Sequence, residues 1–295
     1  MKTPRDYRCH LRLRVRWSEI DQQRIVFNAH YLTYADCAMT EYWRALALPY
    51  EATMHALGGD VYLKKASVEY HASALLDDII DVGMRCVRIG ASSMVFECGI
   101  FRGAALLVAV ELIYVFADPA TQTKKDVPPA LRAVIESFEA GNEMAELRVG
   151  SWQELGAAAT PLRTAVFVQE QGVAPEVEMD ALDRVAVHAV AFNRLGVAVA
   201  TGRLLPAQDG EARVGRMAVA RALRGQRWGR LLLEALVRAA QGRGDASVLL
   251  HAQCHAEGFY RRAGFVAEGE VFDEAGIAHI TMRKMLRWDD RVIQH

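Results

Sequence analysis

The spacing of apolar positions in the first part of the chain predicts one helix beside several strands. Residues 12–17 alternate basic and apolar side chains, which is typical of a half-exposed strand. Residues 31–46 repeat apolar side chains at helical spacing, and these share one side: Leu32, Ala35, Met39, Trp43 and Leu46. Residues 61–116 are rich in Val, Ile and Leu, with turns near 75–78, 90–93 and 102–103. The pattern predicts an α+β layout in which one helix meets a largely antiparallel sheet.

A polar stretch with three prolines, residues 118–129, separates this part from the next. A short helix is predicted over 130–140, and Gly141-Asn142 breaks its pattern. We therefore expect one domain over residues 1–142 and a second over 143–295. In the second, Ser151 and Glu154 have the spacing of a capping box at a helix start. Alternating elements then indicate a mixed α/β domain: strands at 146–149, 186–193, 196–205, 212–219, 247–252 and 277–286, and helices at 225–241 and 255–262.

Composition narrows the class of protein without identifying it. Hydrophobic residues make up 52% of the 295 residues and charged residues 24%, which excludes wholesale disorder. The formal net charge of −1 gives no bulk attraction for nucleic acid. The five cysteines match no metal-binding spacing, and an odd number argues against a disulfide framework. With no visible leader and no apolar stretch long enough to span a bilayer, we expect a cytoplasmic protein that binds neither membrane nor metal.

A carboxylate precedes the first predicted helix at a position where it can do chemistry. Asp21 follows the first strand, and the helix begins about nine residues later. Unpaired amides at a helix start can polarise a carbonyl oxygen while a carboxylate attacks the carbonyl or activates water. The alternative is a solvated loop residue or a helix cap.

The residues around Asp21 resemble the opening of a known family. The matching runs are 17–21 (WSEID), 25–32 (IVFNAHYL) and 38–41 (AMTE), followed by 74–78, 89–93 and 106–109. They resemble hotdog-fold acyl-CoA thioesterases of the 4-hydroxybenzoyl-CoA and YbgC/FadM type, over roughly residues 8–138. The resemblance implies a long helix wrapped by an antiparallel sheet, and sites formed between paired subunits of a homo-dimer or tetramer. It places the catalytic aspartate on Asp21 and the substrate-binding helix start on Asn28, His30 and Tyr31.

One departure from that family leaves two interpretations open. The family usually has glycine just before the Ile-Val pair, and this chain has Arg24. Arginine adopts positive φ only at a cost, and it brings a bulky cation to the site. It could bind a substrate carboxylate or a CoA phosphate, or it could block the pocket and leave an idle acyl-CoA-binding and dimerisation module.

A glycine-bearing turn in the second half favours an anion site. Residues 224–229 (RGQRWG) follow a predicted strand and open a helix, so backbone amides and the helix dipole can hold phosphate oxygens. Six arginines lie between positions 213 and 230. Such a run is also typical of a solvated face or a nucleic-acid patch. Nucleic acid is disfavoured, because Trp228 is the only aromatic side chain within the run.

The second half as a whole resembles the GNAT N-acyltransferases, within them the ElaA-like branch, over roughly residues 146–287. The matching runs include 162–171, 178–183, 215–219, 224–229, 253–265 and 269–282. The resemblance implies acetyl-CoA or another acyl-CoA as the donor. It places CoA binding on Met217, Ala218, Val219, Arg224, Gly225, Gln226, Arg227, Trp228, Gly229 and Gln253. It assigns Tyr260 as the acid that protonates the leaving thiolate, and Arg227 stands where the family motif has its middle glycine.

The acceptor side is less sharply defined by sequence. An acidic stretch can either attract a small cationic amine or form a solvated loop: Glu170, Glu178, Asp180 and Asp183. His188 and His279 are candidate bases, although both fall in predicted strands. The sequence therefore predicts a bifunctional CoA enzyme, a thioesterase followed by an N-acyltransferase. The alternative is an N-acetyltransferase whose first domain only binds acyl-CoA and dimerises.

Overall fold

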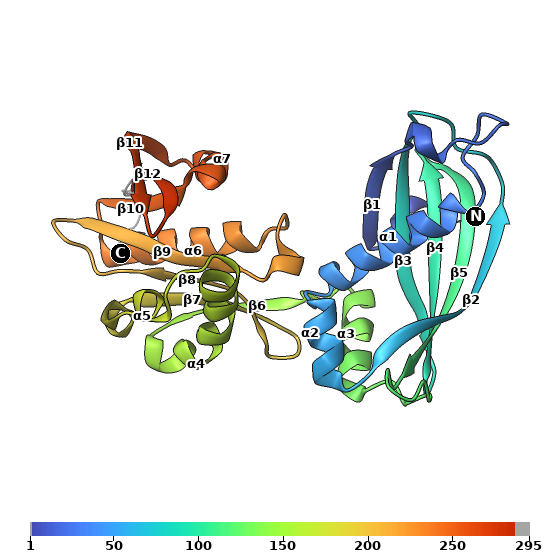
Figure 1. Cartoon of the computed structure of the whole chain (residues 1–295), viewed down its shortest axis with the longest axis horizontal. Helices are drawn as coiled ribbons and strands as arrows, with labels where there is room; N and C mark the ends of the chain where they lie inside the picture. Colours follow the sequence, from blue (N-terminus) through green and yellow to red (C-terminus); the bar gives the residue numbers. More distant parts are fainter. Residues whose placement is uncertain (1, 287–295) are drawn as a thin grey trace, which may run out of the picture. The chain divides into compact units, whose positions relative to one another are not determined.

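The computed structural model describes residues 2–286, and its contacts divide the chain into two compact units, Met1–Met144 and Ala145–His295. The first unit has one antiparallel sheet in the order β1-β3-β4-β5-β2 (Figure 1). Its strands are β1 (Cys9–Arg14), β2 (Asp60–Tyr70), β3 (Ile79–Ile89), β4 (Ser93–Arg102) and β5 (Ala105–Ala117). Its helices are α1 (His30–Ala45), α2 (Tyr50–Leu57) and α3 (Pro129–Glu139). The predicted α+β class and hotdog layout are confirmed.

Helix α1 packs against this sheet mainly through a row of aromatic side chains. Tyr31, Tyr34, Ala38 and Tyr42 recur at helical spacing and are buried against strands that include β1 and β3. Leu32, expected on that buried side, is 37% exposed. The other four residues predicted to share that side are buried: Ala35, Met39, Trp43 and Leu46.

Two further elements of the first unit differ from the pattern. The strand expected over 12–17 is β1, which ends at Arg14, and Trp17–Glu19 form a single tight turn instead. A second helix, α2, was not predicted; it begins after Pro49, whose fixed φ suits a helix start.

The second unit is built on a seven-stranded mixed sheet in the order β11-β12-β10-β9-β8-β7-β6. Its strands are β6 (Ala145–Gly150), β7 (Val187–Asn193), β8 (Ala198–Leu204), β9 (Glu211–Val219), β10 (Ser247–Gln253), β11 (Val266–Glu274) and β12 (Ile277–Met285). Its helices are α4 (Trp152–Arg163), α5 (Pro175–Glu178), α6 (Trp228–Arg243) and α7 (Glu257–Arg262). The pairing of β9 with β10 is parallel, and the other strand pairings within the described part of this sheet are antiparallel.

Helices cover both faces of this sheet. Along β7, Ala189 and Ala191 pack in the cluster of α6, whereas Val190 and Phe192 pack in that of α4. Because strand side chains alternate between faces, α4 and α6 lie on opposite sides. At the start of α4, the Glu154 carboxylate accepts hydrogen bonds from the amide and hydroxyl of Ser151, as the capping-box spacing predicts.

Candidate active sites

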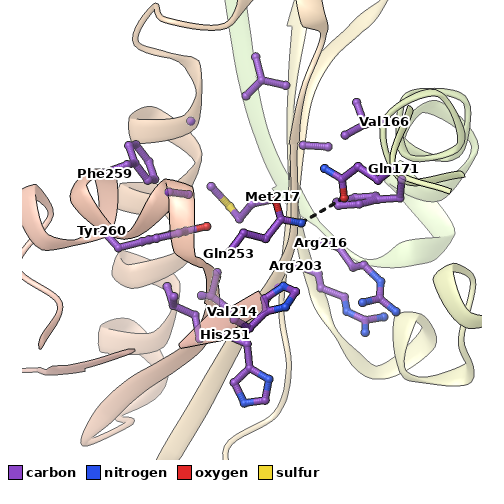
Figure 2. Close-up of a pocket in the computed structure, with 18 of the residues that line it drawn as sticks. Val166, Gln171, Arg203, Val214, Arg216, Met217, His251, Gln253, Phe259 and Tyr260 are labelled. Atoms are coloured by element: carbon purple, nitrogen blue, oxygen red, sulfur yellow. Dashed lines mark hydrogen bonds between the residues drawn. The ribbon is translucent and has the colours of Figure 1, made fainter. Parts of the chain in front are cut away.

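The central feature of the second unit is the point where β9 and β10 separate. The two strands pair only over Glu211–Val214 and Ser247–Leu250, so the ends of both strands lie beyond the shared ladder. On its other edge β9 pairs with β8 through a register shift between Thr201 and Arg203. Opposite this shift Arg216 has a left-handed φ of 52°. Such a bulge bends its strand, and a cavity of about 710 Å³ opens where β9 leaves β10 (Figure 2).

The turn after β9 closes one end of this cavity. Gly225 has a φ of 80°, which suits glycine, and α6 begins three residues later at Trp228. The first amides of a helix have no partner within it, so they are available to an anion. Arg227 has an ordinary helical φ of −76°, so the missing middle glycine of the family motif costs this turn no backbone strain.

Most of the predicted CoA-binding residues line this one cavity. They are Met217, Ala218, Val219, Arg224, Gly225, Gln226, Gly229 and Gln253. Arg227 and Trp228 belong to the same turn but are not among the lining residues. The side-chain amide of Gln253 donates to Oε1 of Gln171 at 3.2 Å, which links β10 to the segment after α4 (Figure 2).

Tyr260 enters the cavity from α7. Figure 2 shows its hydroxyl directed toward the centre, on the side of Gln253 and Met217. The ring packs against Phe259 and Phe265, and burial raises the pKa of Tyr260 to about 12. The phenol therefore keeps its proton at neutral pH, as a proton donor must.

The acidic residues expected to face an amine are paired with arginines. Glu170 receives two hydrogen bonds from Arg224, at 2.5 and 2.7 Å, and these lower the pKa of Glu170. Asp180 receives two from Arg203, both at 2.7 Å, and these lower the pKa of Asp180. These carboxylates are neutralised within the fold and present little free negative charge.

Glu178 and Asp183 belong to a buried network with Arg163. The Arg163 guanidinium, 1% exposed, donates to Oε1 of Glu178 at 2.6 Å and to Oδ1 of Asp183 at 2.8 Å. Arg216 pairs with the other Glu178 oxygen at 2.7 Å, and Arg203 with Asp183 at 2.8 Å. Burial nonetheless raises the pKa of Glu178 against the pull of these arginines. The network fixes Arg203 and Arg216, which line the cavity.

Three histidines of the second unit, His188, His251 and His279, differ in their access to the cavity. His188 is 1% exposed, and its Nε2 lies 2.9 Å from the carbonyl of Asp183. His279 lines the cavity, with Nδ1 2.7 Å from the carbonyl of Ile277. Sequence reasoning missed His251 and Glu274, which also line the cavity and lie 2.7 Å apart. One usable signal was the two-residue spacing of His251 and Gln253, which gives both side chains the same face of a strand.

In the first unit, Asp21 lies in a tight turn before α1. Its Oδ1 accepts a hydrogen bond of 2.8 Å from the amide of Gln23, and its backbone amide donates to the carbonyl of Ile25 at 2.9 Å. Arg24 occupies the left-handed region with a φ of 63°, and its side chain is exposed. The turn thus keeps the backbone conformation that glycine favours, although arginine occupies the position.

The predicted substrate-binding residues surround the start of α1. Tyr31 is 2% exposed, and its hydroxyl accepts a hydrogen bond from the amide of Ala74 at 2.9 Å. The carbonyl of Asn28, an exposed residue, accepts one from the Tyr70 hydroxyl at 3.2 Å. His30 is the first residue of α1 and contacts the exposed ring of Phe27. These contacts tie the start of α1 to the end of β2 and to the segment that follows it.

A second cavity, of about 380 Å³, opens beside the same helix. It is lined by Glu19, Tyr34, Cys37 and neighbouring residues, and Asp21 is not among them. Glu19 is 2% exposed and accepts hydrogen bonds from Arg16 and from the Tyr34 hydroxyl. Burial raises the pKa of Glu19, but these hydrogen bonds outweigh burial and leave it below its ordinary value.

Comparison with known proteins assigns both units. The sequence model of the GNAT acetyltransferase domain matches residues 165–286. The uncharacterized N-acetyltransferase YjcF of Bacillus subtilis is 34% identical over 124 residues, which cover 42% of this chain and 87% of YjcF. The chain is a member of the GNAT acetyltransferase family. Protein ElaA of Escherichia coli is likewise 34% identical to this GNAT protein, over 43% of the chain and 85% of ElaA.

The first unit of this GNAT protein matches a different family. The sequence model of the thioesterase superfamily covers residues 23–109, which confirms the fusion of the two domains. One solved thioesterase, from Thermus thermophilus in complex with coenzyme A and Zn, is 23% identical with a TM-score of 0.41. The match covers 46% of this chain and 96% of the Thermus thermophilus chain. No helix within residues 2–286 is long and apolar enough to cross a membrane.

Proposed function

We propose that the second unit transfers an acyl group, in the first instance acetyl, from CoA to a small amine. The observation that carries this proposal is the separation of β9 from β10 beside the Tyr260 hydroxyl. Strand edges without a ladder partner can pair with the amides of a pantetheine arm. Met217, Ala218 and Val219 line the opening on the β9 side and Gln253 on the β10 side.

The residues present suit a phosphate-bearing donor. The left-handed Gly225 and the open start of α6 direct backbone amides to one place, and Arg224, Gln226 and Gly229 border the same end of the cavity. Arg227 and Trp228 complete the turn, and Arg227 adds a cation beside it. We assign the pyrophosphate of the donor to this turn.

Tyr260 is the proposed general acid. The amine nitrogen attacks the thioester carbonyl, the carbon–sulfur bond breaks, and Tyr260 gives its proton to the departing thiolate. Tyr260→Phe keeps the ring packing but removes the donor, so kcat is expected to fall by about a hundredfold or more with little change in acetyl-CoA affinity. Steady-state transfer kinetics and calorimetric binding measure the two quantities. Unchanged kcat would remove Tyr260 from the reaction.

For the first unit we propose acyl-CoA thioester hydrolysis at Asp21. Asp21 attacks the thioester carbonyl or activates water, while amides at the start of α1 stabilise the oxyanion. The oxygen of Asp21 that does not serve the turn is available for this role. Asn28 and His30 border the substrate, and the buried Tyr31, predicted to do so as well, instead fixes the helix start through its bond to Ala74.

Thiol release from acyl-CoA without added amine tests this assignment. Asp21→Asn retains an oxygen for the Gln23 amide and removes the charge, so hydrolysis should be lost while the turn persists. Acyl-CoA binding with no hydrolysis by the wild-type chain would favour the other candidate function, an idle binding and dimerisation module. A monomeric mass by light scattering would contradict the homo-dimer or tetramer that we propose through this unit.

A further inference from the structure

We propose that His251, oriented by Glu274, is the base that takes the proton from the acceptor ammonium. This inference rests on the proposed acyl transfer and adds an acceptor subsite to it. His251 lies on β10 immediately past the last residue paired with β9, so it faces the place where the strands separate. Its side chain is 26% exposed, accessible to a ligand yet partly desolvated.

Position along the strand separates this subsite from the donor. His251 and Gln253 are two residues apart, about 7 Å along β10. Gln253 lies on the side of Tyr260, where the thiolate would leave (Figure 2). His251 contacts Phe272 and Glu274 of β11, so we place the amine at the His251 end of the cavity, away from the proposed phosphate-binding turn.

Glu274 gives the imidazole its orientation. It ends β11, and the left-handed Ala275 and Gly276 form the hairpin that returns the chain as β12. Its Oε2 lies 2.7 Å from Nδ1 of His251. Nδ1 also faces a guanidinium nitrogen of Arg213, which can only donate, whereas a carboxylate can only accept, so the two contacts call for opposite states of Nδ1. We assign the proton to Nδ1, because the guanidinium has Oε1 of Glu274 as an alternative acceptor, and this leaves the lone pair of Nε2 free to receive another proton.

Two groups facing the pair influence its charge. Nη2 of Arg213, from β9, lies 2.8 Å from Nδ1 of His251 and 3.6 Å from Oε1 of Glu274. His279, from β12, lines the same cavity. Burial raises the pKa of Glu274, but His251, Arg213 and His279 outweigh burial and hold it below its ordinary value. Glu274 therefore stays ionised at neutral pH and stabilises the imidazolium that forms.

Other candidates for the base fit less well. The carboxylates of Glu178, Asp180 and Asp183 are each bound by arginine. His279 is 9% exposed, its Nδ1 faces a neutral carbonyl, and its ring stacks on Phe272. A carbonyl supports an imidazolium less than a carboxylate does.

The proton balance of the reaction is complete with these groups. The ammonium gives one proton to Nε2 of His251, and the neutral amine forms the new carbon–nitrogen bond. The carbon–sulfur bond breaks, and the thiolate takes the proton of Tyr260. The nitrogen then loses its second proton, which restores the phenol through solvent. The net products are the amide, free CoA and one proton, which His251 releases.

Amines that differ only in their need for a base test the proposal. Transfer from acetyl-CoA by the full chain is measured with propylamine, lysine and spermidine, which are ammonium ions at neutral pH, and with methoxyamine, which is uncharged. For His251→Gln we expect the rate ratio of ammonium to methoxyamine substrates to fall by about a hundredfold. Circular dichroism and acetyl-CoA binding control for folding.

Variants of the neighbours give independent outcomes. Glu274→Gln removes the charge, so the acid limb of the kcat/KM profile with propylamine should move to lower pH, a shift that a purely structural role would not produce. An equal loss with both amine classes in His251→Gln overturns the proposal. A loss of activity with the ammonium substrates alone in His279→Gln also overturns it, because His279 would then be the base. The proposal fails as well if Arg213→Gln shows that selective loss and Glu274→Gln has no effect, because the His251 proton would then lie on Nε2. If the wild-type chain acylates none of the amines, the acyl transfer itself is refuted.

Discussion

Arg163, a buried arginine of the second unit, offers a quantitative test of how strongly the ionic network stabilises the cavity wall. Arg163 is 1% exposed and makes three hydrogen bonds, to Oε1 and the carbonyl of Glu178 and to Oδ1 of Asp183. It also lies over the Trp152 ring at 5.2 Å. Arg163→Met fills much of the volume but leaves two buried carboxylates with one arginine fewer each.

The expected cost lies at the low end of the range for breaking a buried ion pair. Removing one partner typically costs about 3–5 kcal/mol. Glu178 keeps Arg216 and Asp183 keeps Arg203, so neither charge is left alone. We therefore expect Arg163→Met to lower the free energy of unfolding by about 3 kcal/mol, which corresponds to a decrease of about 1.5 M in the urea midpoint at an m-value of about 2 kcal/mol/M.

The assay must report the second unit alone, because a two-unit chain need not unfold in one step. Hydrogen exchange of peptides from residues 145–286 across a urea series gives that local midpoint. Arg230→Met is the matched control, since it breaks an ion pair with Glu234 that is exposed on both sides and should leave the midpoint nearly unchanged. A shift no larger than in this control would refute the claim that the network supports the cavity wall.

Three further substitutions test local geometry in both units. Gly225→Ala meets no neighbouring atom but forces a side chain into a φ of 80°, so strain of about 1 kcal/mol should raise KM for acetyl-CoA about fivefold in steady-state assays. Glu19→Gln should weaken the dependence of first-unit stability on acidic pH. Because the pKa of Glu19 is lowered from 4.5 in the folded state, its ionised form stabilises the fold above pH 4.5, and this stabilisation is lost as the pH falls below that value. Urea midpoints measured across the pH range would record the difference. Arg24→Gly should change stability by less than about 0.5 kcal/mol, because relief of left-handed strain is offset by the entropy of glycine in the unfolded chain. An altered rate of thioester hydrolysis in that variant would then report the lost cation and not the fold.

Pattern and resemblance predicted the main elements because those elements carry a periodic apolar face. β11 was not expected, since Val266–Glu274 is mostly polar and exposed and is held as an outer strand by pairing with β12. Its absence from the prediction also hid Glu274. A carboxylate at the end of an unrecognised strand could not be placed beside a histidine more than twenty residues earlier.

The acidic stretch shows a second limit of local sequence. Glu178, Asp180 and Asp183 look like a solvated or amine-attracting loop when only their neighbours are considered. Their partners are Arg163, Arg203 and Arg216, which come from α4, β8 and β9. Charge pairing between distant elements depends on the assembled sheet, so no spacing rule along the chain could have identified it.

The pair formed by Arg224 and Glu170 has a consequence for ligand choice. The guanidinium at the proposed phosphate-binding turn is already bonded through two nitrogens to a carboxylate from the segment after α4. Any incoming anion must compete with that internal one, so a single weak negative charge gains little by displacing it. A diphosphate that also accepted hydrogen bonds from the amides at the start of α6 would gain enough to do so. If the proposed site binds CoA there, Glu170 would act as an internal competitor for Arg224 and would favour multiply charged donors over the simple anions of the surrounding solution.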